Sequence, residues 1–75
     1  MEKFAVVLVQ STNQAMRIEH LLHLSGITSQ LMPIPKFLSS NCGNCLRIQL
    51  DDIEKVKTVI DENKIIIEGI EVIAY

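Results

Sequence analysis

Two cysteines, Cys42 and Cys45, stand three positions apart in a chain of 75 residues that contains no other cysteine. This Cys-x-x-Cys spacing suits three kinds of chemistry: a dithiol that forms a disulfide, half of a metal site, or a cysteine that carries sulfur beside a resolving thiol. A fourth interpretation is structural, because cysteine commonly serves as a small buried apolar residue. The spacing alone does not choose among the four.

The residues around Cys42 favour a stabilised thiolate. Ser39 and Ser40 carry short hydrogen-bonding side chains, and Gly43 permits a tight turn whose amides face the sulfur. Lys36 adds a cation a few residues upstream. We therefore expect Cys42 to be the nucleophilic cysteine of the pair.

The position of Cys45 bears on the redox and metal alternatives. Thioredoxin-type chemistry places the pair at the start of a helix, whereas Cys45 opens a predicted strand. A metal needs about four ligands, and the only histidines, His20 and His23, lie inside a predicted helix away from the cysteines. We expect no metal site within one chain. A four-thiolate zinc or iron–sulfur site shared by two copies stays open, as does a resolving role for Cys45.

Two charged residues, Glu19 and Arg47, stand among apolar positions of the predicted elements. Glu19 lies inside the apolar arc of the first predicted helix, about 40° from Ala15 at about 100° per residue. It is either a rim carboxylate that reaches solvent or pairs with His23, or part of a site. Arg47 alternates with buried aliphatic residues, so its guanidinium points to the open face of the sheet. A surface role is its default, and contact with an anionic sulfur or selenium group is the alternative.

The elements that must position these residues follow from hydrophobic periodicity. A continuous apolar run at residues 4–9 predicts a central strand covered on both faces. Ser11 begins a capping-box pattern, which predicts a helix over about residues 12–24 that ends at Gly26. The stretch 30–35 predicts an edge strand, because its two prolines lack amide donors.

The second half of the chain again predicts a strand, a helix and a strand. Alternation over residues 46–50 predicts a strand with one buried face, and Asp51 or Asp52 begins a helix that ends at residues 63–64. Residues 65–75 are strand-like. The order predicts a single α+β domain over residues 1–75, a ferredoxin-like βαββαβ sandwich whose antiparallel sheet carries two helices on one face.

In this fold, the turn after the first strand and the loop between the second and third strands share one end of the sheet. The positive N-terminus of the first helix, near residues 10–13, should therefore lie beside the loop 36–45 that carries both cysteines. A site for a thiolate is expected there.

Composition and charge exclude several classes of protein. Nine acidic and seven basic residues, for a net charge of −2, form no basic block, so nucleic acid is not an expected partner. The longest apolar run is far shorter than the roughly 18 residues of a membrane span. No signal-peptide pattern precedes it, and we expect a cytoplasmic protein. A hydrophobic content of 48% is typical of a folded chain.

A longer motif surrounds the cysteines. The motif consists of two prolines, a basic residue, an apolar residue, two serines, a Cys-Gly pair and a later arginine. In this chain these positions hold Pro33, Pro35, Lys36, Leu38, Ser39, Ser40, Cys42, Gly43 and Arg47. With this motif the chain resembles the selenium/sulfur carrier-like family. The first helix also looks like that family's, at Ser11, Thr12, Ala15, Glu19, Leu22, Gly26 and Ile27. The resemblance is weak after Asp51, and Cys45 departs from the pattern, which commonly has a small apolar residue there.

The resemblance implies a carrier in which Cys42 accepts a persulfide or selenopersulfide from a donor protein and delivers it to an acceptor enzyme. It implies no cofactor beyond the carried atom. Two alternatives stay open: a redox module that cycles between a dithiol and a Cys42–Cys45 disulfide, and a homodimeric binding domain with a shared four-thiolate metal site. An enzyme is the weaker expectation, because no paired carboxylates, Ser-His dyad or phosphate-binding loop can be picked out.

Overall fold

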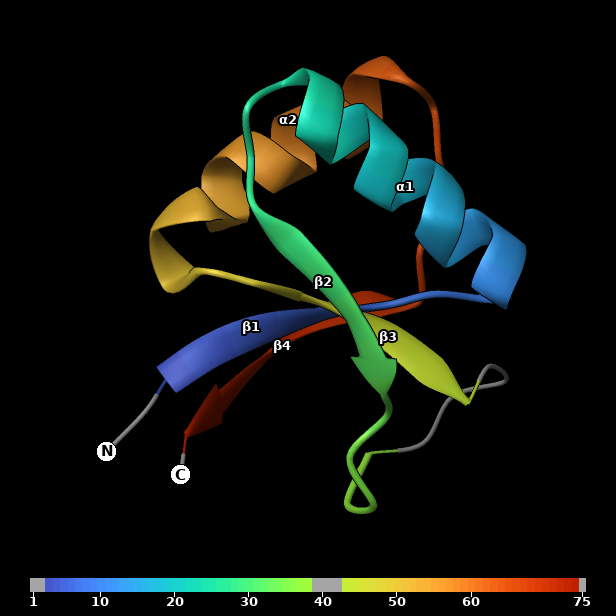
Figure 1. The fold of residues 1–75 in the computed structure, drawn as a ribbon, viewed down its shortest axis with the longest axis vertical. Helices are drawn as coiled ribbons and strands as arrows, with labels where there is room; N and C mark the ends of the chain where they lie inside the picture. Colours follow the sequence, from blue (N-terminus) through green and yellow to red (C-terminus); the bar gives the residue numbers. More distant parts are fainter. Residues whose placement is uncertain (1–2, 39–42, 75) are drawn as a thin grey trace.

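The structure, a computed structural model, describes residues 3–38 and 43–74. In chain order the elements are β1 (Lys3–Leu8), α1 (Thr12–Leu24), β2 (Ser29–Pro33), β3 (Asn44–Ile48), a 3-10 turn η1 (Leu50–Asp52), α2 (Ile53–Glu62) and β4 (Gly69–Ala74). The strands form one antiparallel sheet in the order β2-β3-β1-β4, and both helices cover the same face of it (Figure 1). This confirms the predicted α+β, ferredoxin-like arrangement.

Helix α1 begins and ends where local signals place it. The Ser11 hydroxyl accepts a hydrogen bond from the Gln14 amide at 3.1 Å. The Gln14 side chain reaches back to the Gln10 amide at 2.9 Å, one residue earlier than in a standard capping box. Gly26, with φ of 75°, supplies the left-handed residue that ends the helix.

Loss of the Ser11 cap has a measurable cost. We expect Ser11→Ala to lower the free energy of unfolding by about 1 kcal/mol, because the Gln14 amide loses its acceptor. Ser11→Asp keeps an acceptor at the same place and should retain most of that stability. Urea unfolding followed by circular dichroism compares the three chains, and an equal loss in both variants would contradict this role of the cap.

Both faces of the sheet are buried along β1. Toward the helices, Ala5, Val7 and Val9 join a core that contains Ile18, Leu22, Leu46, Ile48, Val56 and Ile60. On the opposite face, Phe4, Val6, Leu8, Cys45 and Ile73 form a second cluster, against which Met32, Ile34 and Leu38 pack. We call this second group the open-face cluster. Its existence explains why the run at residues 4–9 is apolar without alternation.

The strand ends differ from the sequence-based expectation. β2 stops at Pro33 and β3 starts at Asn44, because these two residues are the last pair of the β2–β3 ladder. One more hydrogen bond, from the Ile34 amide to the Gly43 carbonyl at 3.0 Å, closes the loop beyond them. β4 starts only at Gly69. The amides before it bond elsewhere, that of Ile65 to the end of α2 and that of Glu68 to Leu8 at the end of β1.

The second helix is entered differently from the first. A 3-10 turn precedes α2, and Asp52 stands at its N-cap without a side-chain hydrogen bond to the helix. The helix ends at Glu62, close to the predicted stop, with Lys64 in the left-handed region at φ of 53°. No helix within residues 3–38 and 43–74 is long and apolar enough to cross a membrane.

Candidate functional site

The start of α1 and the start of β3 lie at one end of the sheet, as the topology predicts (Figure 1). A side-chain hydrogen bond joins them: Asn44 Nδ2 donates to Thr12 Oγ1 at 3.2 Å. The β2–β3 loop therefore returns to the sheet beside the first turn of a 13-residue helix. The positive end of a helix is a favourable place for an anion.

Three of the predicted site residues, Ser39, Ser40 and Cys42, lie outside the described residues, so their roles stay predictions. The flanking segments are described. Residues 35–38 form a turn in which the Leu38 amide donates to the Pro35 carbonyl at 3.0 Å, and Leu38 packs on the open-face cluster. Lys36 is exposed within this turn, and Gly43 is exposed on the other side of the loop.

Cys45 is buried completely, with an exposed fraction of 0%. Its side chain belongs to the open-face cluster, and its Sγ lies 4.0 Å from the Pro33 carbonyl oxygen, to which the thiol donates a weak hydrogen bond. The thiol therefore fills the space of a small apolar side chain. A resolving role for Cys45 stays a prediction, because Cys42 lies outside the described residues.

Arg47 points to the open face of the sheet, as predicted, and stacks on an aromatic ring. Its guanidinium carbon lies 4.0 Å from the centre of the Phe4 ring, in the geometry of a cation–π contact. Phe4 stands near the start of β1, whereas Leu8 at the end of that strand pairs with Cys45. The Phe4 contact thus draws the Arg47 side chain away from the cysteine end of the sheet.

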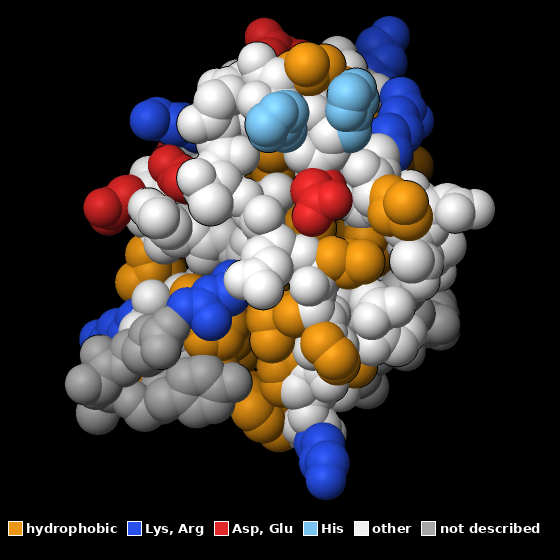
Figure 2. Space-filling view, viewed as in Figure 1, with side chains coloured by type: hydrophobic (Ala, Val, Ile, Leu, Met, Phe, Trp, Pro, Cys, Tyr) orange, Lys and Arg blue, Asp and Glu red, His pale blue; other side chains and the backbone are white. Residues whose placement is uncertain are grey.

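Glu19 is half-buried at the rim of a surface groove of about 540 Å³. The groove runs along α1 and the turn into β2, and its lining comprises Met16, Glu19, His20, His23, Gly26, Ile27, Thr28 and Ser29. Figure 2 shows both histidine side chains close together over the C-terminal half of α1. Glu19 lies seven residues, about 10 Å, from the start of the helix, so the structure does not bring it to the cysteine end.

One interpretation of Glu19 pairs its carboxylate with His23. Within residues 3–38 and 43–74 these two side chains form no ion pair, and a role of Glu19 in a site stays a prediction. In the same part of the chain, no group of three or more histidine, cysteine, aspartate or glutamate side chains is close enough to hold a metal ion.

Residues 4–71 match the model of a protein family described as "Putative Se/S carrier protein-like". The chain belongs to this family. The match confirms the resemblance seen around the cysteines and continues beyond Asp51, through α2 and into β4. The description likens the family to carriers of selenium or sulfur, a class of protein that interacts with partner proteins. No curated protein and no solved structure matches the chain.

Two contacts at the cysteine end were not anticipated from the sequence. Asn44 had no assigned role, although extending the alternation of β3 back from Leu46 places it on the helix-facing side of the sheet. Gln14, which caps the helix, also donates from its Nε2 to the Ile66 carbonyl at 2.7 Å. These bonds hold the start of α1 between β3 and the segment that leads into β4. The start of β3 therefore lies next to the first turn of α1, which is hydrogen-bonded on both sides.

Proposed function

We propose that this protein carries sulfur or selenium as a persulfide or selenopersulfide on Cys42, between a donor protein and an acceptor enzyme. The observation that carries the proposal is the family match over residues 4–71, which spans both cysteines. Of the two thiols, Cys45 is completely buried in an apolar cluster. We therefore assign the exchange of sulfur with another protein to Cys42.

The transfer is an exchange between sulfur atoms. The Cys42 thiolate attacks the terminal sulfur of a donor persulfide, a new S–S bond forms, and the donor's own S–S bond breaks. The donor cysteine leaves as a thiolate, and the transferred sulfur keeps its oxidation state. Delivery is the same step in reverse, with the acceptor's nucleophile attacking the terminal sulfur on Cys42, so neither step needs an external oxidant or reductant.

The surroundings of the loop support an anionic sulfur. Asn44, two residues after Cys42, is hydrogen-bonded to Thr12 in the first turn of α1. The positive end of the helix dipole and the first-turn amides favour a thiolate or a terminal persulfide anion nearby. The exposed ammonium of Lys36 adds positive charge on the other side of the loop.

Both rival functions require the Cys45 sulfur to form a bond. A dithiol–disulfide cycle needs its sulfur to bond with that of Cys42, and a four-thiolate site shared by two chains needs it as a metal ligand. In either case the Cys45 sulfur, which is completely buried in the open-face cluster, would need a second sulfur atom or a metal ion at bonding distance. No contact of the described residues favours either rival over the carrier.

Sulfur loading of the wild-type chain tests the proposal. The purified protein is incubated with a cysteine desulfurase and cysteine or, in parallel, with glutathione persulfide, a donor that needs no protein docking. We expect intact mass spectrometry to show one added sulfur atom per chain, which dithiothreitol removes. A folded chain that takes up no sulfur from either donor contradicts the proposal. A native dimer that loses zinc or iron on denaturation supports the shared metal site instead.

A further inference from the structure

The two edges of the sheet differ in what they offer a neighbouring strand. β2 ends at Pro33, with Pro35 close behind, and prolines lack the amide hydrogen that a new strand would bond. β4 has six residues and no proline, and among the described residues it pairs only with β1. Its outer side is therefore the edge at which another extended segment can continue the sheet.

An apolar groove runs beside this edge. It has a volume of about 360 Å³ and is lined by Lys57, Ile60, Asp61, Ile65, Ile67 and Ile70. Val72, on the same side of β4 as Ile70, is 57% exposed. A strand added outside β4 would place every second side chain over this groove and beside Val72.

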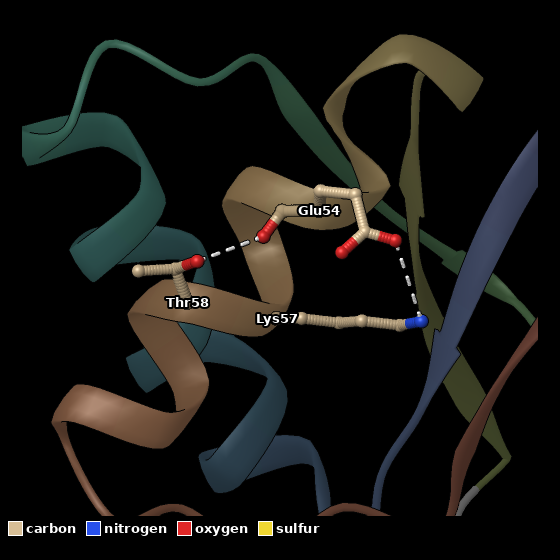
Figure 3. Close-up of polar contacts among 3 residues, drawn as sticks. All are labelled: Glu54, Lys57 and Thr58. Atoms are coloured by element: carbon tan, nitrogen blue, oxygen red, sulfur yellow. Dashed lines mark hydrogen bonds and ion pairs between the residues drawn. The ribbon is translucent and has the colours of Figure 1, made fainter.

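The edge strand carries a negative charge at Glu71. On the other face of β4, Glu71 is exposed and stands next to Val6 of β1. The groove itself is lined by one acid and one base, Asp61 and Lys57, and the Lys57 Nζ lies 3.7 Å from the Glu54 carboxylate (Figure 3). A basic side chain beside Glu71 would be favoured there.

The same charge disfavours a second copy of this chain as the occupant. In an antiparallel pair of two β4 strands, Glu71 stands opposite its own copy, or diagonal to it at about 7 to 8 Å, in the registers that keep most of the ladder. Like charges at these positions destabilise pairing. The edge suits a different protein, with positive charge where a second copy would bring negative charge.

We propose that the outer edge of β4 and the adjacent groove bind an extended segment of a partner protein in which β-branched apolar residues alternate with lysine or arginine. The backbone of that segment continues the sheet, its apolar side chains fill the groove, and its basic side chains lie beside Glu71.

This docking edge lies close to the cysteine end of the sheet. Gly69 at the start of β4 pairs with Leu8, which pairs on its other side with Cys45. The edge strand thus starts about 10 Å, two strand spacings, from β3. A partner held there would have its adjoining loops near the start of β3. The inference extends the proposed function but does not rest on it.

A peptide titration tests the docking edge. Isotope-labelled protein is titrated with a blocked six-residue peptide of alternating valine and lysine, and NMR amide shifts are recorded; the matched control peptide alternates valine and glutamate. We expect saturable shifts confined to β4 and the groove, with the lysine peptide only. Glu71→Lys should weaken its binding roughly three- to tenfold and allow the glutamate peptide to bind.

Several outcomes would overturn the inference. They are a lysine peptide that does not bind, shifts that map to β2 or to the α1 groove, an affinity that Glu71→Lys leaves unchanged, and a peptide-free protein that dimerises through β4. Cys42→Ser should bind the lysine peptide as the wild type does. Docking and sulfur carriage are therefore measured separately, and the failure of one is not read as the failure of the other.

Discussion

Cys42→Ser is expected to abolish sulfur loading, whereas Cys45→Ala should load as fully as the wild-type chain. A serine hydroxyl cannot form the S–S bond that holds the carried atom, so the loss in the first variant should be complete. Cys45 is buried in the open-face cluster, and alanine there removes one sulfur atom from packing without touching the acceptor. Intact mass after incubation with desulfurase and cysteine measures both variants.

The comparison separates the carrier from its rivals, because only a carrier loses its function in Cys42→Ser and keeps it in Cys45→Ala. A dithiol cycle or a four-thiolate metal site needs both sulfur atoms and loses its function in either variant. Cys45→Ala is destabilised by the small cavity it leaves, so loading is measured at a temperature where circular dichroism shows it folded. Full loading of Cys42→Ser would end the assignment of Cys42 as the acceptor.

Leu22→Ala should destabilise the protein strongly. Leu22 is completely buried in the cluster between α1 and the sheet. Losing its side chain leaves a cavity and should lower the free energy of unfolding by about 2 to 5 kcal/mol. Since a chain of this length is stabilised by only roughly 4 to 11 kcal/mol, much of its stability would be lost.

Leu24→Ala is the matched control for this prediction. The same substitution, two residues further along α1, removes a side chain that is 68% exposed. Its effect on the free energy of unfolding should stay within about 0.5 kcal/mol. Urea unfolding of both variants decides the matter, and equal losses would show that the helix buries a different face from the one described.

Local signals in the sequence were enough to predict the fold and the limits of α1. The Ser11 cap, the spacing of apolar residues along the helix and the positive φ of Gly26 all act within a few residues of one another. The order of the elements then leaves few topologies, since short connections join neighbouring strands. The shared end of α1 and β3, on which the proposed site depends, followed from that topology.

Features that depend on distant partners could not be predicted in the same way. The start of β3 is fixed by the pairing of Asn44 with Pro33, and the start of β4 by amides that bond to other elements first. The Cys-x-x-Cys spacing carries no information on the burial of Cys45, which depends on the open-face cluster. The stacking of Arg47 on Phe4 likewise joins residues from two different strands.

The position of the carried atom in the unmodified sequence is the most direct test of Cys42 as a sulfur carrier. Wild-type protein is loaded with desulfurase and cysteine, alkylated under native conditions and fragmented in a mass spectrometer. We predict that the added sulfur is found on fragments that contain Cys42 and that Cys45 stays unmodified until the chain is unfolded. Sulfur on Cys45, or a Cys42–Cys45 disulfide as the main product, would contradict the carrier function.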